Sequence, residues 1–516
     1  MLRKLILLFT LFCFFGTFAQ TNYAEVTYVN HLKGTVLDSK SKEPLPYANI
    51  YVLNTTNGVI SNETGNFSLN IAGIKESDTV CFQYIGYRTK NISFKQLQDS
   101  STILLEEELF NLSETLVFGS IPNLKDIVKK VIENKDVNYK KTNSKLKVFI
   151  RKRENSDIKN FDLDLRKTSF DELDENLIRT IEKAMPKNSI SYTDFMGNFY
   201  CSAVQDDSIK YKTDPIRTVS LKEKDIAELE QLEKVFENVF KNTDEEEYWK
   251  IKSGIFGQKI DMDEENNDTV SKKDTTINNS RRRLSYFNNS IVNNLKFSNL
   301  DDEKQWEFLY KLSRYKYTLA GGIAVNGEDV YIIDFEPNNR GMYIGRMYIS
   351  METYALIKAD YKYAPGKNGR DLSLLGVSYS EDQFKGSVYF QKKDGTYKLK
   401  YYSKTEGASV GFDRSIALLK KRKRWLFDKT LNEIKVGINL EIESSSLVEF
   451  LVLDENEISH NQYANFKQQE YMDVIYVDQF DEDLWKEYSI IEPTRKMREY
   501  KKLASDDFIS GKANTE

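Results

Sequence analysis

Tight-turn dipeptides divide residues 311–403 into strand-length runs. Asn326-Gly327 and Asp394-Gly395 favour the positive backbone angles of two-residue hairpins, so the runs that flank them must pair antiparallel. The flanking runs are 315–325 with 329–335 and 387–392 with 396–402, and a further pair is expected at 341–349 with 354–363. We therefore expect a meander of about six or more antiparallel strands with helices on one side, a sheet that can curl into an open half-barrel.

The composition agrees with a β-rich chain. Aromatic residues make up 13% of the 516 residues, with 31 Tyr and 30 Phe, and such large flat side chains favour pleated surfaces. A chain of this length exceeds one hydrophobic core, which predicts about two or three domains. The 74 Lys and Arg nearly balance the 79 Asp and Glu, so no overall electric field attracts nucleic acid.

Residues 1–19 have the pattern of a secretory signal. Arg3 and Lys4 precede an apolar run at 5–15, and small residues follow it before the expected cleavage site. The run is shorter than a membrane span, which makes a retained anchor the weaker alternative. A bulky residue precedes Cys13, so lipid attachment there is not expected. We predict a mature protein in the periplasm or associated with the outer membrane.

Residues 32–118 contain short apolar runs separated by turns. In one of these runs Ala48, Ile50 and Val52 share one face and alternate with more polar neighbours, the period of a strand with one buried side. The strand-length runs are 33–36, 47–52, 66–69 and 79–82. Runs at this spacing predict a β-sandwich.

The same residues carry a family resemblance. The motifs, in order, are Gly34-x-Val36-x-Asp38, Pro44-Leu45-Pro46-x-Ala48-x-Ile50, Thr64-Gly65-x-Phe67-x-Leu69 and Asp78-x-Val80-x-Phe82-x-Tyr84-Ile85-Gly86-Tyr87. They resemble the carboxypeptidase-regulatory-like domain, which in Bacteroidetes precedes many outer-membrane receptors and envelope proteins. The resemblance implies a transthyretin-like sandwich and no peptidase activity. The fold class expected is thus mainly β (α+β), with this sandwich, a larger antiparallel sheet and packed helices.

Helical periodicity appears beyond the sandwich. Residues 121–140 predict a connecting helix with one apolar face, and a capping box at Ser169–Glu172 predicts a helix that runs to about Met185. A further amphipathic helix near 223–241 is expected to pack in the core, with a partner-binding helix or a lid as the alternative. Residues 261–283 contain almost no large apolar residue, which predicts a mobile insertion.

The larger domain, expected at 145–415, also has a resemblance. Residues 330–337, 344–349 and 354–356 resemble segments of other Bacteroidetes envelope proteins, and the meander is similar to the β half of the outer-membrane lipoprotein carrier fold. This similarity implies a lipid or lipoprotein carrier with a half-barrel cavity, an implication that comes from fold analogy alone.

Residues 416–516 are expected to form a C-terminal extension packed on the second domain, with Trp485 docked into its body. A basic run with an adjacent aromatic residue is the candidate contact with a membrane or a partner, and its residues are Lys420, Lys421, Arg422, Lys423, Arg424 and Trp425. A solvated strand edge or turn is the alternative structure for this run.

Histidine is too scarce for the chemistry of a zinc peptidase. His31 and His460 are the two histidines of the chain, whereas such a site needs paired His with an acidic ligand. A calcium loop that began at the acidic stretch 261–265 would need Gly and Glu where the chain has Asn266 and Lys272. We therefore expect no catalytic, cofactor-binding or metal-binding residues, and no cofactor.

One enzyme motif weighs against that expectation. Residues 407–411 match the nucleophile elbow around Ser409, and Asp428 or Asp454 and then His460 follow in hydrolase order. An elbow requires a parallel strand that turns sharply into a helix. Since the preceding strand belongs to an antiparallel hairpin, we expect a Gly-rich loop here and keep a serine esterase as an alternative.

Cysteine usage adds little. After removal of the signal the chain has Cys81 and Cys201, which an oxidising periplasm could join, but they lie in segments assigned to different domains. We expect two buried free thiols. Together these patterns predict a secreted, non-catalytic envelope binding or assembly protein, whose larger domain offers an aromatic-lined concave sheet to a lipid, a glycan or an envelope protein.

Overall fold

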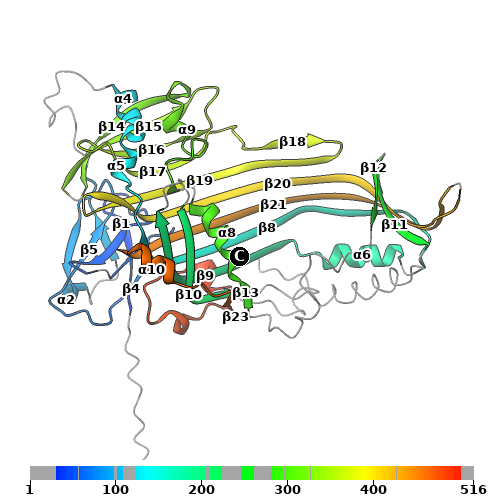
Figure 1. Ribbon diagram of the computed structural model, residues 1–516, viewed down its shortest axis with the longest axis horizontal. Helices are drawn as coiled ribbons and strands as arrows, with labels where there is room; N and C mark the ends of the chain where they lie inside the picture. Colours follow the sequence, from blue (N-terminus) through cyan, green and yellow to red (C-terminus); the bar gives the residue numbers. More distant parts are fainter. Residues whose placement is uncertain are drawn as a thin grey trace, which may run out of the picture.

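The computed structural model describes residues 31–500, apart from residues 56, 98–101, 109–122, 172, 204–208, 222–245, 255, 261–280, 296–297, 326 and 426. The signal predicted at 1–19, the helix predicted at 223–241 and the acidic stretch 261–265 lie outside the described residues. The described chain is mainly β, with a small N-terminal sandwich beside one very large sheet (Figure 1).

Two small sheets form the N-terminal sandwich, which confirms the predicted β-sandwich. Their strand orders are β4-β1-β7 and β3-β2-β5-β6. The elements are β1 (His31–Asp38), β2 (Asn49–Val52), β3 (Gly58–Ile60), β4 (Asn66–Asn70), β5 (Thr79–Gln83), β6 (Lys90–Ser93), α2 (Phe94–Leu97) and β7 (Thr102–Leu105). In β2 and just before it, Ala48, Ile50 and Val52 are buried in the sandwich core, as their alternation predicted.

Within the described residues, 14 strands form the large sheet. Its main path is β14-β15-β16-β17-β19-β20-β21-β8-β9-β10-β23, while β18 pairs with β19 and β11 pairs with both β20 and β12. The strands are β8 (Ser144–Thr168), β9 (Asn188–Ala203), β10 (Ile209–Leu221), β11 (Glu247–Ser253), β12 (Phe256–Ile260), β14 (Tyr315–Val325), β15 (Glu328–Pro337), β16 (Tyr343–Ser350), β17 (Leu356–Tyr363), β18 (Asp371–Leu374), β19 (Val377–Lys393), β20 (Thr396–Arg422), β21 (Lys429–Glu457) and β23 (Ile475–Val477).

The predicted hairpins are present. Strands β14 and β15 pair antiparallel around Gly327, whose φ is 79°, and β19 and β20 pair antiparallel around Asp394 and Gly395, with φ of 49° and 77°. The pair predicted at 341–349 and 354–363 is formed by β16 and β17. Positive φ at both Asp394 and Gly395 is what a hairpin turn matched to the twist of its strands requires.

The helices lie around this sheet. They are α4 (Leu124–Glu133), α5 (Lys135–Asn138), α6 (Glu175–Ala184), α8 (Leu284–Leu295), α9 (Glu307–Tyr310), η4 (Leu312–Arg314), α10 (His460–Asn465), η5 (Glu482–Trp485) and α11 (Arg495–Arg498). Helix α4 lies within the predicted connecting helix and buries Ile127, Val128 and Val131, three residues of its apolar face.

The capping box predicted at Ser169 is wrong. Helix α6 begins at Glu175, and Asp174 caps it by accepting a hydrogen bond from the Leu177 amide at 2.8 Å. The Ser169 hydroxyl instead accepts a hydrogen bond from the Glu433 amide at 2.8 Å. The Ser169 amide also donates to the Glu433 carbonyl at 2.9 Å, so hydrogen bonding between these two segments continues one residue past the end of β8.

The aromatic residues of the meander belong to the core. Phe308 of α9 stacks on Phe335 of β15 with ring centroids 4.2 Å apart, and Trp306 lies 5.6 Å from Tyr361 of β17. Trp306 and Phe308 are fully buried. The open aromatic-lined concave surface that we expected is thus filled by the chain's own helical segment.

The first part of the predicted C-terminal extension belongs to the sheet. The boundary expected at 415 falls inside β20, and β21 lies between β20 and β8. Residues 281–283, the end of the predicted insertion, form β13 (Arg281–Arg283), which pairs with β22 (Tyr471–Asp473). Trp485 docks as expected, since it is buried with its ring 5.6 Å from Phe149.

The sandwich is packed against the large sheet and the C-terminal segment. The ring of Tyr47 lies 4.8 Å from that of Tyr401 in β20. Asn62 donates a hydrogen bond to the Glu492 carbonyl at 3.0 Å, and His31 Nε2 lies 2.9 Å from the Lys486 carbonyl oxygen. The two parts of the chain are therefore joined by both apolar and polar contacts.

Candidate functional site

Three strands continue far beyond the core of the large sheet. Strands β8, β20 and β21 run side by side past α8 to the end of the molecule, where β11, β12 and α6 lie (Figure 1). We call this part, which comprises 153–168, 404–422 and 429–446, the sheet extension. Almost all of its residues are partly or fully exposed, whereas most residues of β8 from Ser144 to Arg151 are buried or nearly so.

The sheet extension has one apolar side. Residues that pair directly across strands point to the same side of a sheet, so the row Phe412, Leu440 and Phe161 marks this face. The apolar face, as we define it, consists of Leu372, Leu374, Val377, Tyr379, Val410, Phe412, Ile416, Leu418, Ile434, Val436, Ile438, Leu440, Ile442, Ile158, Phe161, Leu163 and Leu165. Leu372, Leu374 and Val377 are exposed, whereas the other side chains of this set are half-buried. Arg414, which pairs with Ile438, stands on the same side, and its guanidinium donates a hydrogen bond to the Ser253 carbonyl at 3.3 Å.

The opposite side of the sheet extension is polar. Its rows include Asp413 with Asn439 and Asp162, and alternate residues of β21 there are Glu441 and Glu443. A period of two along each strand therefore gives an amphipathic sheet, with aliphatic residues on one side and acids and amides on the other. A sheet with one wet face normally covers its apolar face with another layer.

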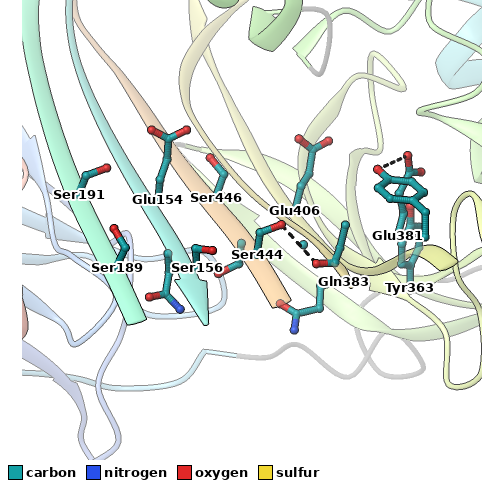
Figure 2. Close-up of a pocket in the computed structure, with 15 residues that line it drawn as sticks. Glu154, Ser156, Ser189, Ser191, Tyr363, Glu381, Gln383, Glu406, Ser444 and Ser446 are labelled. Atoms are coloured by element: carbon teal, nitrogen blue, oxygen red, sulfur yellow. Dashed lines mark hydrogen bonds between the residues drawn. The ribbon is translucent and has the colours of Figure 1, made fainter. Parts of the chain in front are cut away.

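A hollow crosses the strands between the core and the apolar face. It has a volume of about 580 Å³, and Figure 2 shows its lining. We call it the polar trough, and its residues are Glu154, Asn155, Ser156, Ser189, Ser191, Tyr363, Tyr379, Glu381, Gln383, Glu406, Gly407, Ala408, Ser444, Ser445 and Ser446. Small side chains stand next to one another because Ser189, Ser156, Ser444 and Ala408 pair in one row.

Carboxylates mark the next row of the trough. Glu154 pairs across the strands with Ser446, and Ser446 with Glu406, so the two carboxylates stand on the same side with a serine between them (Figure 2). Lys152 Nζ lies 2.6 Å from Glu154, and Lys404 Nζ lies 2.7 Å from Glu406. Burial lowers the pKa of Lys404, although Glu406 favours its charged form.

The β19 end of the trough is aromatic. The Tyr379 hydroxyl donates a hydrogen bond to Glu381 at 3.2 Å, and the Tyr363 ring packs 5.4 Å from that of Phe384. Burial, followed by the hydrogen bond to Glu381, raises the pKa of Tyr379. The trough thus offers hydroxyls that both donate and accept, and carboxylates that accept.

The predicted basic run lies at the tip of the sheet extension. Lys420, Lys421 and Arg422 end β20, and Lys423, Arg424 and Trp425 are in the turn to β21. Glu247 of β11 lies 3.0 Å from Lys420 Nζ and 2.5 Å from Arg422 Nη2. Trp425 is 96% exposed and Phe427 81% exposed. The backbone of the basic run thus follows the alternative prediction, a strand edge or turn. The side chains of Trp425 and Phe427 are exposed to solvent.

The elements of a serine hydrolase are not brought together. Ser409 lies in the middle of β20, paired with Ser380 on one side and Glu443 on the other, and its hydroxyl donates a hydrogen bond to Asp382. His460 begins α10, beyond the end of β21 at Glu457. Because Ser409 pairs with Glu443, the end of β21 lies roughly 45 Å farther along the strand, at about 3.3 Å per residue.

The two aspartates of that hypothetical triad have other partners. Asp428 accepts a hydrogen bond from the Tyr248 hydroxyl at 2.5 Å, and Asp454 accepts one from Asn456 at 2.7 Å. The segment 407–411 is regular strand, so neither the predicted loop nor a strand-to-helix elbow is formed there.

Cys81 and Cys201 are free and buried, as predicted. Among the described residues, no group of three or more His, Cys, Asp or Glu is placed to hold a metal ion. In the part of the chain that the structure describes, no helix is both long enough and apolar enough to cross a membrane.

Sequence reasoning missed the trough and the apolar face. The alternation Ile434, Val436, Ile438, Leu440 and Ile442 was a readable strand signal in the tail. The serines at 444–446 carried no signal of their own, because only the cross-strand register places them beside Ser156 and Glu406.

Comparison with known proteins identifies the N-terminal part. Residues 32–117 match the family model of the CarboxypepD_reg-like domain, so the chain carries such a domain. No curated protein matches the chain.

Among solved structures, MucB of Pseudomonas aeruginosa in its complex with MucA is 8% identical, with 62% of this chain and 94% of that chain covered and a TM-score of 0.15. A putative outer membrane lipoprotein-sorting protein domain from Vibrio parahaemolyticus is 10% identical, with 66% and 97% covered and a TM-score of 0.18. A LolA superfamily protein from Nitrosomonas europaea is 8% identical, with 67% and 99% covered and a TM-score of 0.15. At such TM-scores these likenesses carry no argument about fold or function.

Proposed function

We propose that this protein is a non-catalytic binding protein of the cell envelope that takes up a lipid-like amphiphile on the apolar face of its sheet extension. The apolar face is the observation that carries the proposal. It extends over β18, β19, β20, β21 and β8. At about 4.8 Å between strands and 3.3 Å per residue, it measures roughly 20 by 30 Å.

An apolar patch of this size has a physical cost. Its footprint is roughly 600 Å², and the partly exposed aliphatic side chains on it form a contiguous apolar surface. Contiguous exposed apolar patches mark interaction sites. Each methylene that leaves water for such a surface contributes about 0.8 kcal/mol. Binding of an acyl chain along the strands therefore offsets the free-energy cost of exposing the aliphatic side chains to water.

The tip of the sheet extension supports a location at a membrane surface. Trp425 and Phe427 stand in solvent beside the basic run, and aromatic residues with adjacent cations suit the headgroup region of anionic lipids. Export by the signal predicted at 1–19 would bring the protein to the envelope, where it would meet such surfaces. An assembly role with an envelope protein bound to the apolar face is the second candidate.

The experiment compares two matched double variants of the mature protein. Ile438→Thr with Leu440→Thr removes aliphatic area from the apolar face, whereas Asn439→Thr with Glu441→Thr makes the same change on the polar side of the same strand. Lauric acid binding is measured by isothermal titration calorimetry, with circular dichroism as the check on folding. We expect the first variant to lose binding at least about tenfold and the second to keep it. Equal binding by both variants, or no binding by the wild type, would contradict the proposal.

A further inference from the structure

We propose that the polar trough is a headgroup site that selects an uncharged, hydroxyl-rich sugar head, so that the amphiphile bound by this protein is a neutral glycolipid. This inference rests on the proposed function, because the trough would hold the head of the molecule whose chains lie on the apolar face. Three features of the described residues support it: the position of the trough, the chemistry of its lining and the shape of its aromatic end.

The trough and the apolar face are successive rows on one side of the same strands. Ser444 and Ile442 are two residues apart on β21, and their partners Ala408 and Val410 are two residues apart on β20. Alternate residues of a strand are about 7 Å apart. A head in the trough would therefore place its chains directly on the apolar face, with no barrier between them.

The lining favours hydroxyl groups over phosphates. Serine hydroxyls donate and accept hydrogen bonds, while the carboxylates of Glu154, Glu381 and Glu406 accept them from hydroxyl donors. No Arg or Lys is among the described residues that line the trough. Phosphate recognition relies on such cations, and carboxylates repel an anionic head.

Lys152 and Lys404 neutralise part of this charge without entering the trough. Each pairs with one of its glutamates, at 2.6 Å and 2.7 Å. Glu381 accepts hydrogen bonds from the Tyr379 hydroxyl and the Arg370 amide, and Arg370 Nε lies 3.9 Å from it. The site therefore has acceptor capacity with little excess negative charge. An uncharged polyhydroxy head satisfies these acceptors without bringing a charge of its own.

The aromatic end suits the flat face of a sugar ring. Tyr363 and Tyr379 each present an apolar ring with a polar tip, the combination that packs on the C–H face of a sugar while the hydroxyls reach polar partners. A volume of about 580 Å³ lies in the range of small-molecule sites.

The test uses three probes that share one tail and differ in their heads. Dodecyl maltoside, dodecyl phosphocholine and lauric acid, each below its micelle concentration, are titrated into the mature protein in a calorimeter. We expect the maltoside to bind at least about tenfold more tightly than either of the others, the difference that one charge-assisted hydrogen bond supplies. Equal affinity for all three would overturn the headgroup proposal and leave the proposed function intact.

Variants locate the preference. Glu154→Gln with Glu406→Gln should reduce maltoside affinity about tenfold and leave lauric acid binding unchanged or stronger. Glu441→Gln with Glu443→Gln, the same change on the opposite side of β21, should alter neither. Loss of the preference in this control variant, or tighter binding of the phosphocholine, would refute the assignment. Absence of binding by all three probes, or a dimer in which the apolar face is buried, would instead overturn the proposed function.

Discussion

The substitution Glu449→Gln removes a buried carboxyl group from the side of the large sheet that packs on the sandwich. Glu449 pairs across the strands with Arg151 and Ser403 and is 4% exposed. Arg151 is already engaged, because it donates to both oxygens of Asp194 at 2.8 and 2.7 Å and to the Ile491 carbonyl at 2.8 Å. Within the described residues Glu449 Oε1 has no hydrogen-bond partner.

The size of the expected change in stability follows from the pKa of the Glu449 carboxyl group. Burial, partly opposed by Arg151, raises the pKa of Glu449 from 4.5 to about 7. Between these values the folded protein keeps a proton that the unfolded chain has released, so wild-type stability falls as pH rises through this window. At about 1.4 kcal/mol for each pKa unit, the loss amounts to about 3 kcal/mol.

The Gln variant lacks this ionisation. We therefore expect the stability of Glu449→Gln relative to wild type to increase by about 3 kcal/mol between pH 4.5 and pH 8. Urea denaturation at both pH values, followed by tryptophan fluorescence, measures the difference. Glu443→Gln, on the exposed side of β21, serves as the control and should show no such trend. Parallel pH profiles for wild type and Glu449→Gln would refute the reasoning.

The remaining predictions concern the buried ion pair and the tip. Arg151→Met should destabilise the protein by about 3–5 kcal/mol in urea denaturation, because it leaves Asp194 buried without its partner, whereas Arg151→Met with Asp194→Leu should cost much less. Lys423→Ser with Arg424→Ser should weaken sedimentation with phosphatidylglycerol vesicles by about 1 kcal/mol for each charge, and Trp425→Ala should weaken it further. Vesicle binding that ignores salt and these changes would exclude the tip as the contact.

The local features of the fold could be predicted from the sequence, and the long-range ones could not. Asp394-Gly395 specifies its hairpin because the turn depends on two adjacent residues. The continuation of β20 to Arg422 escaped prediction, because Gly407 and Gly411 suggested a Gly-rich loop, whereas both lie on the polar side of a regular strand. This part of β20 is a strand because it pairs with β21, which pairs in turn with β8. The pairs between β21 and β8 join residues nearly 300 positions apart, so no local pattern reveals them.

The candidate site shows the same division. The basic run ending at Trp425 is contiguous in sequence and could be identified there, whereas the trough is made of single residues from separate strands. Ser444 becomes a neighbour of Ser156 only through a register that includes a shift between Glu441 and Ile442. Because a slip of one residue would exchange the two sides of the sheet, composition alone could not place these serines.

The edges of the sheet extension strengthen the argument that its apolar face is the interaction surface. Where β8 continues past its pairing with β9, the segment around α6 covers its edge. The Leu163 amide donates to Glu182 at 2.6 Å, and the Ile158 amide donates to the Lys187 carbonyl at 2.8 Å. On the other side β11 pairs with β20 near the tip. Strand β18 pairs with β19 alone and is therefore an open edge, but it is only four residues long. Covered edges and very short edge strands both discourage the addition of a further strand, so association through the sheet extension is directed to its face. The face itself provides what an amphiphile needs, aliphatic side chains next to a row of hydroxyls.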